Sequence, residues 1–331
     1  MRQIKKILIA NRSEIAIRIS RAATELGFKT VSIYSYEDRF ALHRFKTDES
    51  YLVGSGLGPI QAYLDYKGIV QIAVNSGCDA IHPGYGFLSE NPEFADECAK
   101  YNIIFVGPSP NIMRSLGNKV EAKKTAGKAK VPTIPSTGPL PKDLKKCKDL
   151  AKKIGYPIML KASWGGGGRG MRVIKKETEL ENHINTARRE AKSAFGKDDV
   201  FFEKLIEKAF HVEVQIIGDT HGNIVHLFER DCSLQRRHQK VVERAPAAYL
   251  SDKERNAICE AGVRIGKQVN YSCAGTVEFL MDAKSRDFFF IEVNPRVQVE
   301  HTVTEEITGI DIVKAQFLLA AGAKIGDDIC G

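Results

Sequence analysis

The sequence predicts an α/β fold in its N-terminal part and an α+β fold in the remainder. Strand and helix patterns alternate from residue 4 to residue 107, as in doubly wound sheets with parallel strands. From residue 205 onward, strands with alternating apolar residues are joined by short turns, which is typical of antiparallel sheets. A small unit with four consecutive glycines lies between these two parts. We therefore expect a Rossmann-like domain followed by a two-part α+β region.

The N-terminal part contains short strands that alternate with helices. The expected strands lie at residues 4–10, 29–35, 80–84 and 103–107, and the expected helices at residues 13–27, 61–76 and 90–101. The turn after the first strand reads ANRSE and lacks the glycines of a dinucleotide-binding loop. We therefore expect the fold without its usual cofactor loop, with Asn11 and Ser13 as candidate N-caps of the first helix.

The remaining elements are expected in two groups. A lysine-rich helix begins near Lys119, and a proline-rich connector follows at residues 130–143. The small unit should contain helices at residues 142–154 and 177–195 and strands at residues 157–163, 171–176 and 199–206. The last part should contain strands at residues 211–219, 224–232, 274–282 and 287–294, and helices at residues 251–268 and 303–321.

The glycine-rich stretch at residues 165–170 formally matches G-x-G-x-x-G, a pattern associated with dinucleotide binding. That interpretation needs a helix after the glycines, but the next residues alternate as in a second strand. A P-loop is excluded because no Gly-Lys-Ser/Thr follows. Two interpretations remain: a flap whose backbone N–H groups close over phosphates, or a surface hairpin.

The composition is that of an ordinary globular protein, with 43% hydrophobic and 27% charged residues. No apolar run approaches the roughly 20 residues that a membrane span needs, and no signal peptide is recognisable. The seven cysteines include no C-x-x-C pair, which argues against disulfides or zinc and favours the cytoplasm or an organelle matrix. The net charge of +8 comes largely from lysines on expected helix faces, so small anionic substrates are favoured over nucleic acid.

Two glutamates interrupt apolar strands that look like a hairpin pair. Glu278 and Glu292, together with Asn294, offer oxygen ligands suited to Mg²⁺ shared with nucleotide phosphates. The alternative is that they pair with Lys or Arg in structural salt bridges. Lys119 and Lys161 are candidate phosphate ligands, because Lys161 ends an apolar strand beside the glycines, although both are also compatible with surface positions.

Two further segments carry clustered charge. Residues 229–246 contain six cationic residues and fit an anion pocket, a salt-bridged loop or a short arginine-rich RNA motif. In residues 294–306, an extended chain would present Arg296, Gln298 and Glu300 on one side. Those three side chains suit a small planar oxyanion and a carboxylate base, whereas the alternative is a simple ion pair between Arg296 and Glu300.

Several motifs together resemble one family along nearly the whole chain. They are KILIANRSEIAIR, HPGYGFLSEN, GGGGRGMR, ERDCSLQRRHQKVVERAP and EVNPRVQVEHTVTE. The chain resembles the biotin carboxylase component of biotin-dependent carboxylases, a branch of the ATP-grasp superfamily. Ser13, Trp164 and the EVNPR and EHTVTE stretches are more similar to the pyruvate carboxylase branch than to the acyl-CoA carboxylases.

The resemblance implies a domain organisation. Residues 1–118 would form the N-terminal, pre-ATP-grasp domain, and residues 119–321 the ATP-grasp domain with a glycine-flap lid at about 133–204. Residues 322–331 would begin a C-terminal biotin carboxylase domain that is truncated here. We therefore expect this chain to bind ATP but to carboxylate free biotin poorly or not at all.

The resemblance also implies roles for individual residues. Those implied for ATP are Lys119, Lys161, Gly165, Gly166, Gly167, Gly168, Glu203, Lys204, Leu205, His211, Gln235 and His238. Mg²⁺ or Mn²⁺ would be held by Glu278, Glu292 and Asn294. Bicarbonate would contact Lys240, Arg296, Gln298 and Val299, Glu300 would remove its proton, and Tyr85 would lie on the biotin side.

The implied activity is carboxylation of biotin by ATP and bicarbonate through carboxyphosphate, as the first half-reaction of pyruvate carboxylase. A biotin carboxylase subunit of acetyl-CoA or propionyl-CoA carboxylase, or an ATP-binding module without turnover, remains the alternative. The expected partners are a biotinylated carrier domain and a carboxyltransferase domain outside this chain. A homo-oligomer is expected for the full-length protein, and neither nucleic acid nor a membrane is expected as a partner.

Overall fold

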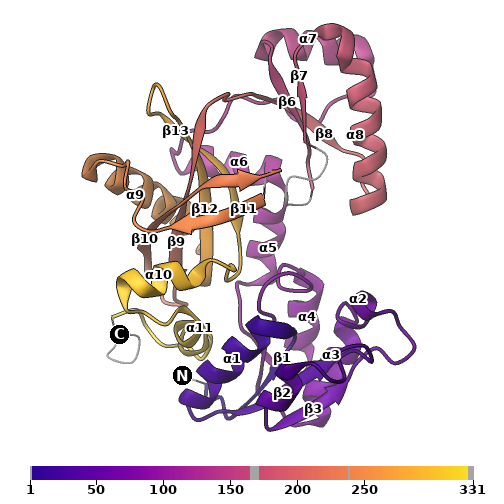
Figure 1. Ribbon diagram of the computed structural model, residues 1–331, viewed down its shortest axis with the longest axis vertical. Coiled ribbons are helices and arrows are strands. Elements are labelled where there is room, and N and C mark those ends of the chain that lie inside the picture. The colour runs from indigo at the N-terminus through magenta and orange to yellow at the C-terminus, as the bar shows by residue number, and fades with distance from the viewer. Residues whose placement is uncertain (1, 165–170, 238, 327–331) are drawn as a thin grey trace.

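The computed structural model describes residues 2–164, 171–237 and 239–326 (Figure 1). Its strands form a parallel sheet in the N-terminal domain, a large antiparallel sheet and a small three-stranded sheet. The N-terminal domain and the small sheet lie at opposite ends of the molecule, with the large sheet between them (Figure 1). The predicted combination of α/β and α+β architecture is confirmed.

The N-terminal sheet has the strand order β3-β2-β1-β4-β5, with all neighbours parallel. Its strands are β1 (Lys6–Ile9), β2 (Lys29–Tyr34), β3 (Glu49–Leu52), β4 (Ala80–His82) and β5 (Ile104–Phe105). The helices α1 (Ser13–Glu25), α4 (Pro92–Lys100) and α5 (Pro110–Gly117) and the 3₁₀ helix η1 (Leu42–Lys46) complete most of the domain. The expected parallel sheet is therefore present, whereas β3, η1 and α5 were not predicted.

The turn after β1 differs from the prediction, because neither Asn11 nor Ser13 caps helix α1. The N-cap position belongs to Arg12, whose side chain makes no capping hydrogen bond. The Asn11 side chain instead donates to the carbonyl oxygens of Pro83 at 2.7 Å and Tyr85 at 2.8 Å. Asn11 therefore joins the loops after β1 and β4, at the switch point where sheets of this topology bind their ligands.

Two helices that were predicted as continuous are each divided in two. In residues 61–76, the Asp65 side chain accepts a hydrogen bond from the Gly68 backbone and starts a new helix. In residues 303–321, Gly309 adopts a left-handed conformation that ends the first helix, and Asp311 caps the next. The observed helices are α2 (Pro59–Ala62), α3 (Tyr66–Asn75), α10 (His301–Thr308) and α11 (Ile312–Ala320).

The small unit is a three-stranded antiparallel sheet with the order β7-β6-β8. Strands β6 (Ile158–Ala162) and β7 (Arg172–Ile174) flank the glycine-rich stretch, so a strand follows it, as predicted. A helix after the glycines, which a dinucleotide loop needs, is thereby excluded, and residues 165–170 themselves lie outside the described residues. The other elements are α6 (Lys119–Lys128), α7 (Leu144–Ile154), η2 (Glu177–Glu179), α8 (Leu180–Phe195) and β8 (Val200–Lys204).

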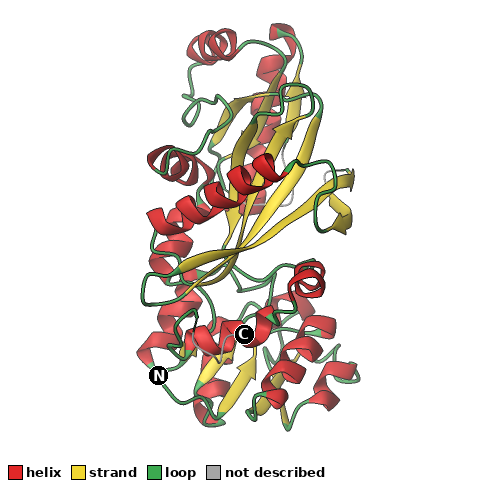
Figure 2. Cartoon of the chain, turned by 90° about the vertical axis from the view of Figure 1, so that its left-hand side faces the viewer, coloured by secondary structure: helices red, strands yellow, loops and turns green. Residues whose placement is uncertain are grey.

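The central antiparallel sheet has the order β11-β10-β9-β12-β13 and is covered on one face by helix α9 (Figures 1 and 2). Its elements are β9 (Ala209–Gly218), β10 (Ile224–Arg236), β11 (Gln239–Arg244), α9 (Asp252–Gln268), β12 (Cys273–Asp282) and β13 (Phe288–Asn294). The predicted hairpins and helix are confirmed. Strand β11 was not predicted, because the cationic segment at 229–246 was interpreted as a pocket or loop.

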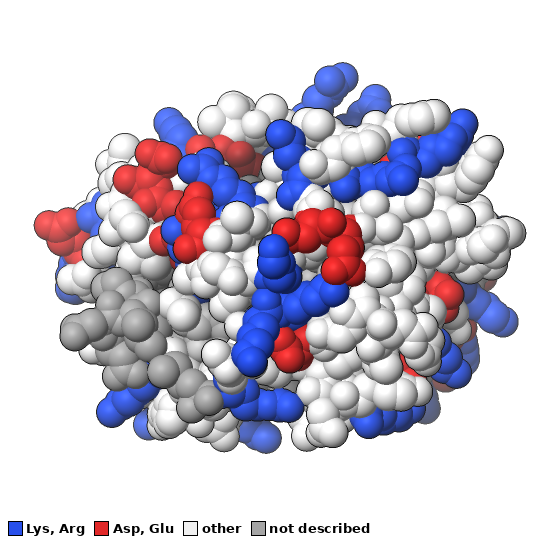
Figure 3. Space-filling model, turned by 90° about the horizontal axis from the view of Figure 1, so that it is seen from below, with Lys and Arg blue, Asp and Glu red and all other residues white. Residues whose placement is uncertain are grey.

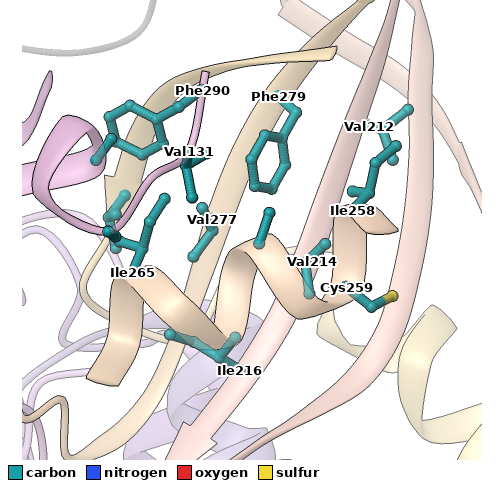
Figure 4. Close-up of a cluster of buried hydrophobic side chains, with 14 of the residues drawn as sticks. Val131, Val212, Val214, Ile216, Ile258, Cys259, Ile265, Val277, Phe279 and Phe290 are labelled. Atoms are coloured by element: carbon teal, nitrogen blue, oxygen red, sulfur yellow. The ribbon is translucent and has the colours of Figure 1, made fainter. Parts of the chain in front are cut away.

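The two faces of this sheet have opposite chemistry. Val212, Val214 and Ile216 of β9 pack with α9 residues such as Ile258 and Ile265 in a buried cluster (Figure 4). Successive side chains of a strand point to opposite faces. The alternate residues 211, 213 and 215 are His, Glu and Gln, and they therefore project from the face that α9 does not cover. The alternating sequence HVEVQ thus gives β9 one apolar face that packs against α9 and one polar face that carries the candidate site residues.

The remaining general features concern the surface and the cysteines. Among residues 2–164, 171–237 and 239–326, no helix has both the length and the apolar character of a membrane span. The six described cysteines are free and buried. On the face shown in Figure 3, basic and acidic side chains are interspersed rather than gathered into one basic surface.

A buried histidine gives the N-terminal domain a predicted pH dependence. His82 at the end of β4 is fully buried, accepts a hydrogen bond from the Gly84 backbone at 3.0 Å, and burial lowers its pKa to about 3. In the unfolded chain the same residue takes up a proton below about pH 6.5. The free energy of unfolding should therefore fall by about 1.4 kcal/mol for each pH unit below that value.

The variant His82→Asn keeps an acceptor for Gly84 but has no proton to gain. Urea denaturation between pH 7.5 and pH 5 should show a shallower loss of stability in this variant than in the original chain. Parallel pH profiles for the two proteins would contradict the assignment of this pH dependence to His82.

Candidate active site

A row of charged residues crosses the polar face of the central sheet. Arg230 on β10 lies opposite Glu213 on β9, and Glu213 lies opposite Glu278 on β12. Glu278 in turn lies opposite Glu292 on β13, which confirms the predicted hairpin pairing of these two residues. Like charges directly opposite each other on neighbouring strands repel. The three glutamates are therefore compatible with a stable sheet only because cations surround them.

Lys240 on β11 is the first of these cations. Its Nζ contacts a carboxylate oxygen of Glu213, lies 2.9 Å from Glu278 Oε1 and lies 2.7 Å from Glu300 Oε1. Burial alone would lower the pKa of Lys240, but the three carboxylates raise it above its ordinary value. Lys240 therefore stays protonated and holds Glu300 beside the glutamates of the sheet.

Arg230 is the second cation and is completely buried. Burial alone would lower its pKa, but Glu213 raises it. Its guanidinium donates hydrogen bonds of 2.6–3.3 Å to Glu213, Gln215, Thr276, Gln298 and Thr304. The fixed fork of the guanidinium thus joins three strands to the segment that precedes and includes α10.

Glu278 has the most complete set of partners in the row. Besides Lys240, Asn294 Nδ2 donates to its Oε1 at 2.8 Å and Gln298 Nε2 donates at 3.2 Å. His211 Nε2 lies 3.0 Å from its Oε2, at ion-pair distance but without the alignment of a hydrogen bond. Burial alone would raise the pKa of Glu278, but His211 and Lys240 hold it well below its ordinary value.

Glu292 is less enclosed and has a cation from another element. Lys119 Nζ, at the start of α6, lies 2.9 Å from Glu292 Oε2. Burial alone would lower the pKa of Lys119, but Glu292 raises it, with a smaller effect of Glu278. The structure therefore contains the lysine–glutamate pairs that were the structural alternative for both glutamates.

The same groups fit the predicted divalent cation. Glu278 and Glu292 face each other across two strands, and Asn294 lies two residues beyond Glu292 on the same strand. The Asn294 side-chain oxygen already accepts a hydrogen bond from Arg296 at 3.2 Å. Carboxylate and amide oxygens are the ligands that Mg²⁺ prefers. The donor set thus has the chemistry of a magnesium or manganese site next to cationic phosphate ligands.

The predicted phosphate ligand Lys161 lies at the junction between the small unit and α6. It is buried on β6 and contacts Glu203 on β8. The Lys119 backbone N–H donates to the Ser163 carbonyl at 3.2 Å, which places the start of α6 beside the end of β6. The two predicted phosphate-binding lysines are thus brought together by the contact between these elements.

The other residues predicted for the nucleotide fall into three groups. Lys204 and Leu205 bind the chain near residue 156: Lys204 Nζ donates to the Gly155 carbonyl at 2.9 Å, and the Leu205 backbone donates to Pro157 at 3.4 Å. His211 and Gln235 are joined at 3.0 Å on neighbouring strands. Gly165, Gly166, Gly167, Gly168 and His238 lie outside the described residues.

The segment after β13 departs from its prediction. Residues 296–300 do not form an extended strand, because Glu300 is already the N-cap residue of α10. Arg296 Nε lies 2.8 Å from Glu90 Oε1, and within the described residues no ion pair joins Arg296 to Glu300. Gln298 and Glu300 are buried, whereas the Val299 residue is 64% exposed. The three predicted side chains nevertheless belong to one network of contacts: Gln298 donates to Glu278, Glu300 binds Lys240, and Arg296 donates to Asn294, which itself donates to Glu278.

Tyr85 and Glu90 belong to the loop after β4, which therefore meets the central sheet. The Tyr85 ring packs at the edge of two buried clusters, one of which contains Val297. Its carbonyl is held by Asn11, and Glu90 in the same loop binds Arg296. The structure thus places the residue predicted for the biotin side near the segment that carries Arg296.

The cationic segment at 229–246 is a strand pair rather than a loop, and its charges have different surroundings. Arg230 is buried in the sheet, while Arg244 is largely exposed and pairs with Asp231 at 2.6 Å. Glu229, the first acidic residue of the segment, binds Arg255 of α9 at 2.9 Å rather than a cation within the segment. The prediction of a loop is thus wrong, because the segment forms strands β10 and β11. The predicted ion pairing within the segment is present between Arg244 and Asp231.

Three charged residues of this region were not singled out from the sequence. They are Glu213, Lys123, which contacts Glu203, and Arg230, which was counted among the cations of 229–246 but was not expected to be buried in an ion pair with Glu213. The alternation in HVEVQ marks Glu213 in the same way that TVEFL marks Glu278, so this signal was available. Lys123 has no such signal, because its helix is rich in lysines along its whole length.

The chain is similar to known families, relatives and solved structures along nearly its whole length. The model described as biotin carboxylase, N-terminal domain, matches residues 3–113. The model described as carbamoyl-phosphate synthase L chain, ATP binding domain, matches residues 118–327. The biotin carboxylase domain of Hydrogenobacter thermophilus 2-oxoglutarate carboxylase, solved with MgADP, ADP and bicarbonate, is 46% identical with a TM-score of 0.95, and the match covers 98% of this chain and 71% of that one. The chain belongs to the biotin carboxylase family.

Within this family, pyruvate carboxylases are among the similar proteins. The Staphylococcus aureus pyruvate carboxylase is 56% identical over 331 residues, which cover 99% of this chain and 28% of that protein. The Rhizobium etli pyruvate carboxylase T882A, solved with acetyl coenzyme A, is 60% identical with a TM-score of 0.95. The match covers 99% of this chain and 29% of that one. This chain thus spans less than a third of the length of these pyruvate carboxylases.

Proposed function

We propose that this chain supplies the ATP- and bicarbonate-binding site for the carboxylation of biotin within a longer enzyme, in the half-reaction that precedes carboxylation of pyruvate to oxaloacetate. The observation that carries the proposal is the position of Lys240, which holds Glu300 beside Glu278. It places a carboxylate that can accept a proton next to the donor set that fits a divalent cation. Phosphoryl transfer depends on positioned cations and charge stabilisation, and these groups supply both.

ATP is proposed to bind between the small unit and the central sheet. Lys119 and Lys161 would contact its phosphates as point charges, and the chain at Glu203, Lys204 and Leu205 would meet the adenine. His211 and Gln235 would lie beside the nucleotide; His238 and the glycines at 165–168 keep their predicted roles as proposals. When bound, the divalent cation held by Glu278, Glu292 and Asn294 would neutralise charge on the phosphates.

Bicarbonate is proposed to bind at the segment after β13. Arg296 and Lys240 would hold its oxygens, with Gln298 and Val299 orienting it. Glu300 would remove its proton, and a carbonate oxygen would attack the γ-phosphorus of ATP to give carboxyphosphate and ADP. Carboxyphosphate would release CO₂ and phosphate. The phosphate would deprotonate the ureido nitrogen of biotin near Tyr85, and that nitrogen would capture CO₂.

Pyruvate is proposed as the final acceptor because the similar proteins include pyruvate carboxylases at 56% identity. The proposal includes a biotinylated carrier domain, a carboxyltransferase domain and a homo-oligomeric assembly, in the cytoplasm or an organelle matrix. An acetyl-CoA or propionyl-CoA carboxylase subunit uses the same half-reaction and is the alternative. Carboxylation assays of the native enzyme with pyruvate, acetyl-CoA and propionyl-CoA separate these acceptors.

The half-reaction is tested in a chimaera in which residues 1–331 replace the corresponding segment of the staphylococcal pyruvate carboxylase. Phosphate release from ATP should depend on bicarbonate, and oxaloacetate should form from pyruvate. A chimaera that binds MgATP but releases no phosphate in response to bicarbonate would support a nucleotide-binding module without turnover instead.

A further inference from the structure

A buried carboxylate between the small unit and α6 is shared by two lysines. Glu203 on β8 contacts Lys123 of α6 through Oε1 and Lys161 of β6 through Oε2. The exposed fractions of the three side chains are only 3%, 9% and 10%, in the order Glu203, Lys123, Lys161. Two cations thus compete for one anion in a place that water hardly reaches.

Lys123 does not behave as a solvated surface lysine. Burial lowers its pKa, although Glu203 acts in the opposite direction. Its ammonium also lies 5.2 Å from the centre of the Phe201 ring, on the strand that carries Glu203. Burial alone would raise the pKa of Glu203, but Lys161 and Lys123 together lower it. Each oxygen of the Glu203 carboxylate thus has its own lysine partner, Lys123 on α6 and Lys161 on β6.

The sharing of one carboxylate by two lysines has a consequence for nucleotide binding, and the inference rests on the function proposed above. To contact a phosphate, Lys161 must give up at least part of its ion pair with Glu203. A buried carboxylate that loses its last cation is strongly destabilising, whereas one that keeps a cation is not. Lys123 approaches the other oxygen of the same carboxylate, so it can remain there while Lys161 moves.

We propose that Lys123 is a positioning residue that keeps Glu203 paired and thereby frees Lys161 for the phosphates of bound ATP. Lys123 acts through Glu203 and does not contact the nucleotide itself. Without Lys123, Lys161 is the one cation that remains paired with this carboxylate among the described residues, and it is held away from the phosphates. The effect of Lys123 on ATP affinity therefore depends on the negative charge of Glu203.

This dependence separates positioning from a structural role. If Lys123 only supports the fold, then removing Glu203 as well removes further contacts and cannot restore binding. If Lys123 acts by neutralising Glu203, then replacing Glu203 with neutral glutamine makes Lys123 dispensable. The double variant thus has opposite expected results under the two explanations.

The test is calorimetric binding of the β,γ-imido analogue of ATP, with Mg²⁺, to the 331-residue chain and its variants. Lys123→Met should weaken binding by roughly tenfold or more. Because Glu203 is itself proposed to meet the adenine, the double variant Lys123→Met/Glu203→Gln is compared with Glu203→Gln rather than with the original chain. In that background Lys123→Met should change the affinity by no more than about threefold. Melting temperatures measured in parallel show whether each variant is folded.

A matched control lies next to Lys123 on the same helix. Lys124 pairs with Glu121 at 2.7 Å, but its side chain is 63% exposed. Lys124→Met removes the same charge from the same helix and should leave the affinity unchanged. A similar loss in this variant would mean that the net charge of α6, rather than the contact with Glu203, determines binding.

The possible outcomes distinguish the inference from the proposed function. If the original chain does not bind the analogue, the proposed nucleotide site is wrong. If it binds, but Lys123→Met binds equally well, or Lys123→Met weakens binding by the same factor in the Glu203→Gln background, the positioning role is wrong. Should Lys123→Met fail to fold, Lys123→Gln replaces it in both backgrounds: a loss of affinity confined to the chain with Glu203 supports the positioning role, and an equal loss in both backgrounds overturns it.

Discussion

Glu300→Gln is expected to reduce bicarbonate-dependent phosphate release in the chimaera by a factor of about 10²–10⁴, the usual contribution of a positioned base. The amide has nearly the shape of the carboxylate but cannot accept the proton of bicarbonate. Lys240 keeps Glu213 and Glu278 as partners, so the site should remain assembled. Affinity for the β,γ-imido analogue of ATP should change by no more than about twofold, because the proposed phosphate ligands are untouched.

The control for this variant is Glu306→Gln on the same helix, where the side chain is exposed. It removes an equal charge near the site and should retain full phosphate release. Unchanged turnover in Glu300→Gln would show that another group removes the proton. A loss confined to nucleotide affinity would assign Glu300 to binding rather than to proton transfer.

Arg230→Met is expected to lower the free energy of unfolding by about 3–5 kcal/mol, the range for breaking a buried ion pair from one side. The substitution leaves Glu213 with Lys240 alone and removes the donor that holds Gln298 and Thr304. Urea denaturation at pH 7.5 measures the change, and failure to obtain folded protein is the extreme form of the same result.

Arg244→Met provides the comparison, because Arg244 lies in the same strand pair and also binds a carboxylate, that of Asp231. Its side chain is 65% exposed, and its partner Asp231 also accepts hydrogen bonds from Ser233 and Tyr249. The expected loss is about 0–1 kcal/mol, as for other exposed pairs. Equal losses in the two variants would contradict the view that burial makes Arg230 important.

The sequence was most informative where local pattern and chemistry coincide. Glu278 and Glu292 each interrupt an apolar strand, and the short connection between those strands predicts that they pair. Their opposite positions in the structure follow from that hairpin. Lys161 stood out in the same way, because it ends an apolar strand beside the glycines. For such residues, strand alternation alone indicates which side chains share a face.

Partners that are distant in the sequence were beyond this kind of reasoning. Lys240 meets Glu213, Glu278 and Glu300 at separations of 27, 38 and 60 residues, which only the strand order and register determine. Asparagine is a residue type typical of helix N-caps, but the Asn11 side chain donates a hydrogen bond to the carbonyl of Pro83, 72 residues away. Local propensity predicted the cap, and the tertiary contact between two loops overrode it.

The two opposite faces of the central sheet also bear on how the protein reaches its native state. A slip of β9 by one residue against β12 would turn Glu213 toward α9 and expose Val212 and Val214 on the other side. Carboxylates without partners would then be buried in an apolar layer at high cost. The charged residues proposed to bind ATP and bicarbonate would thus destabilise a sheet with the wrong strand register. Residues kept for the reaction therefore also favour the correct pairing of β9 with β12.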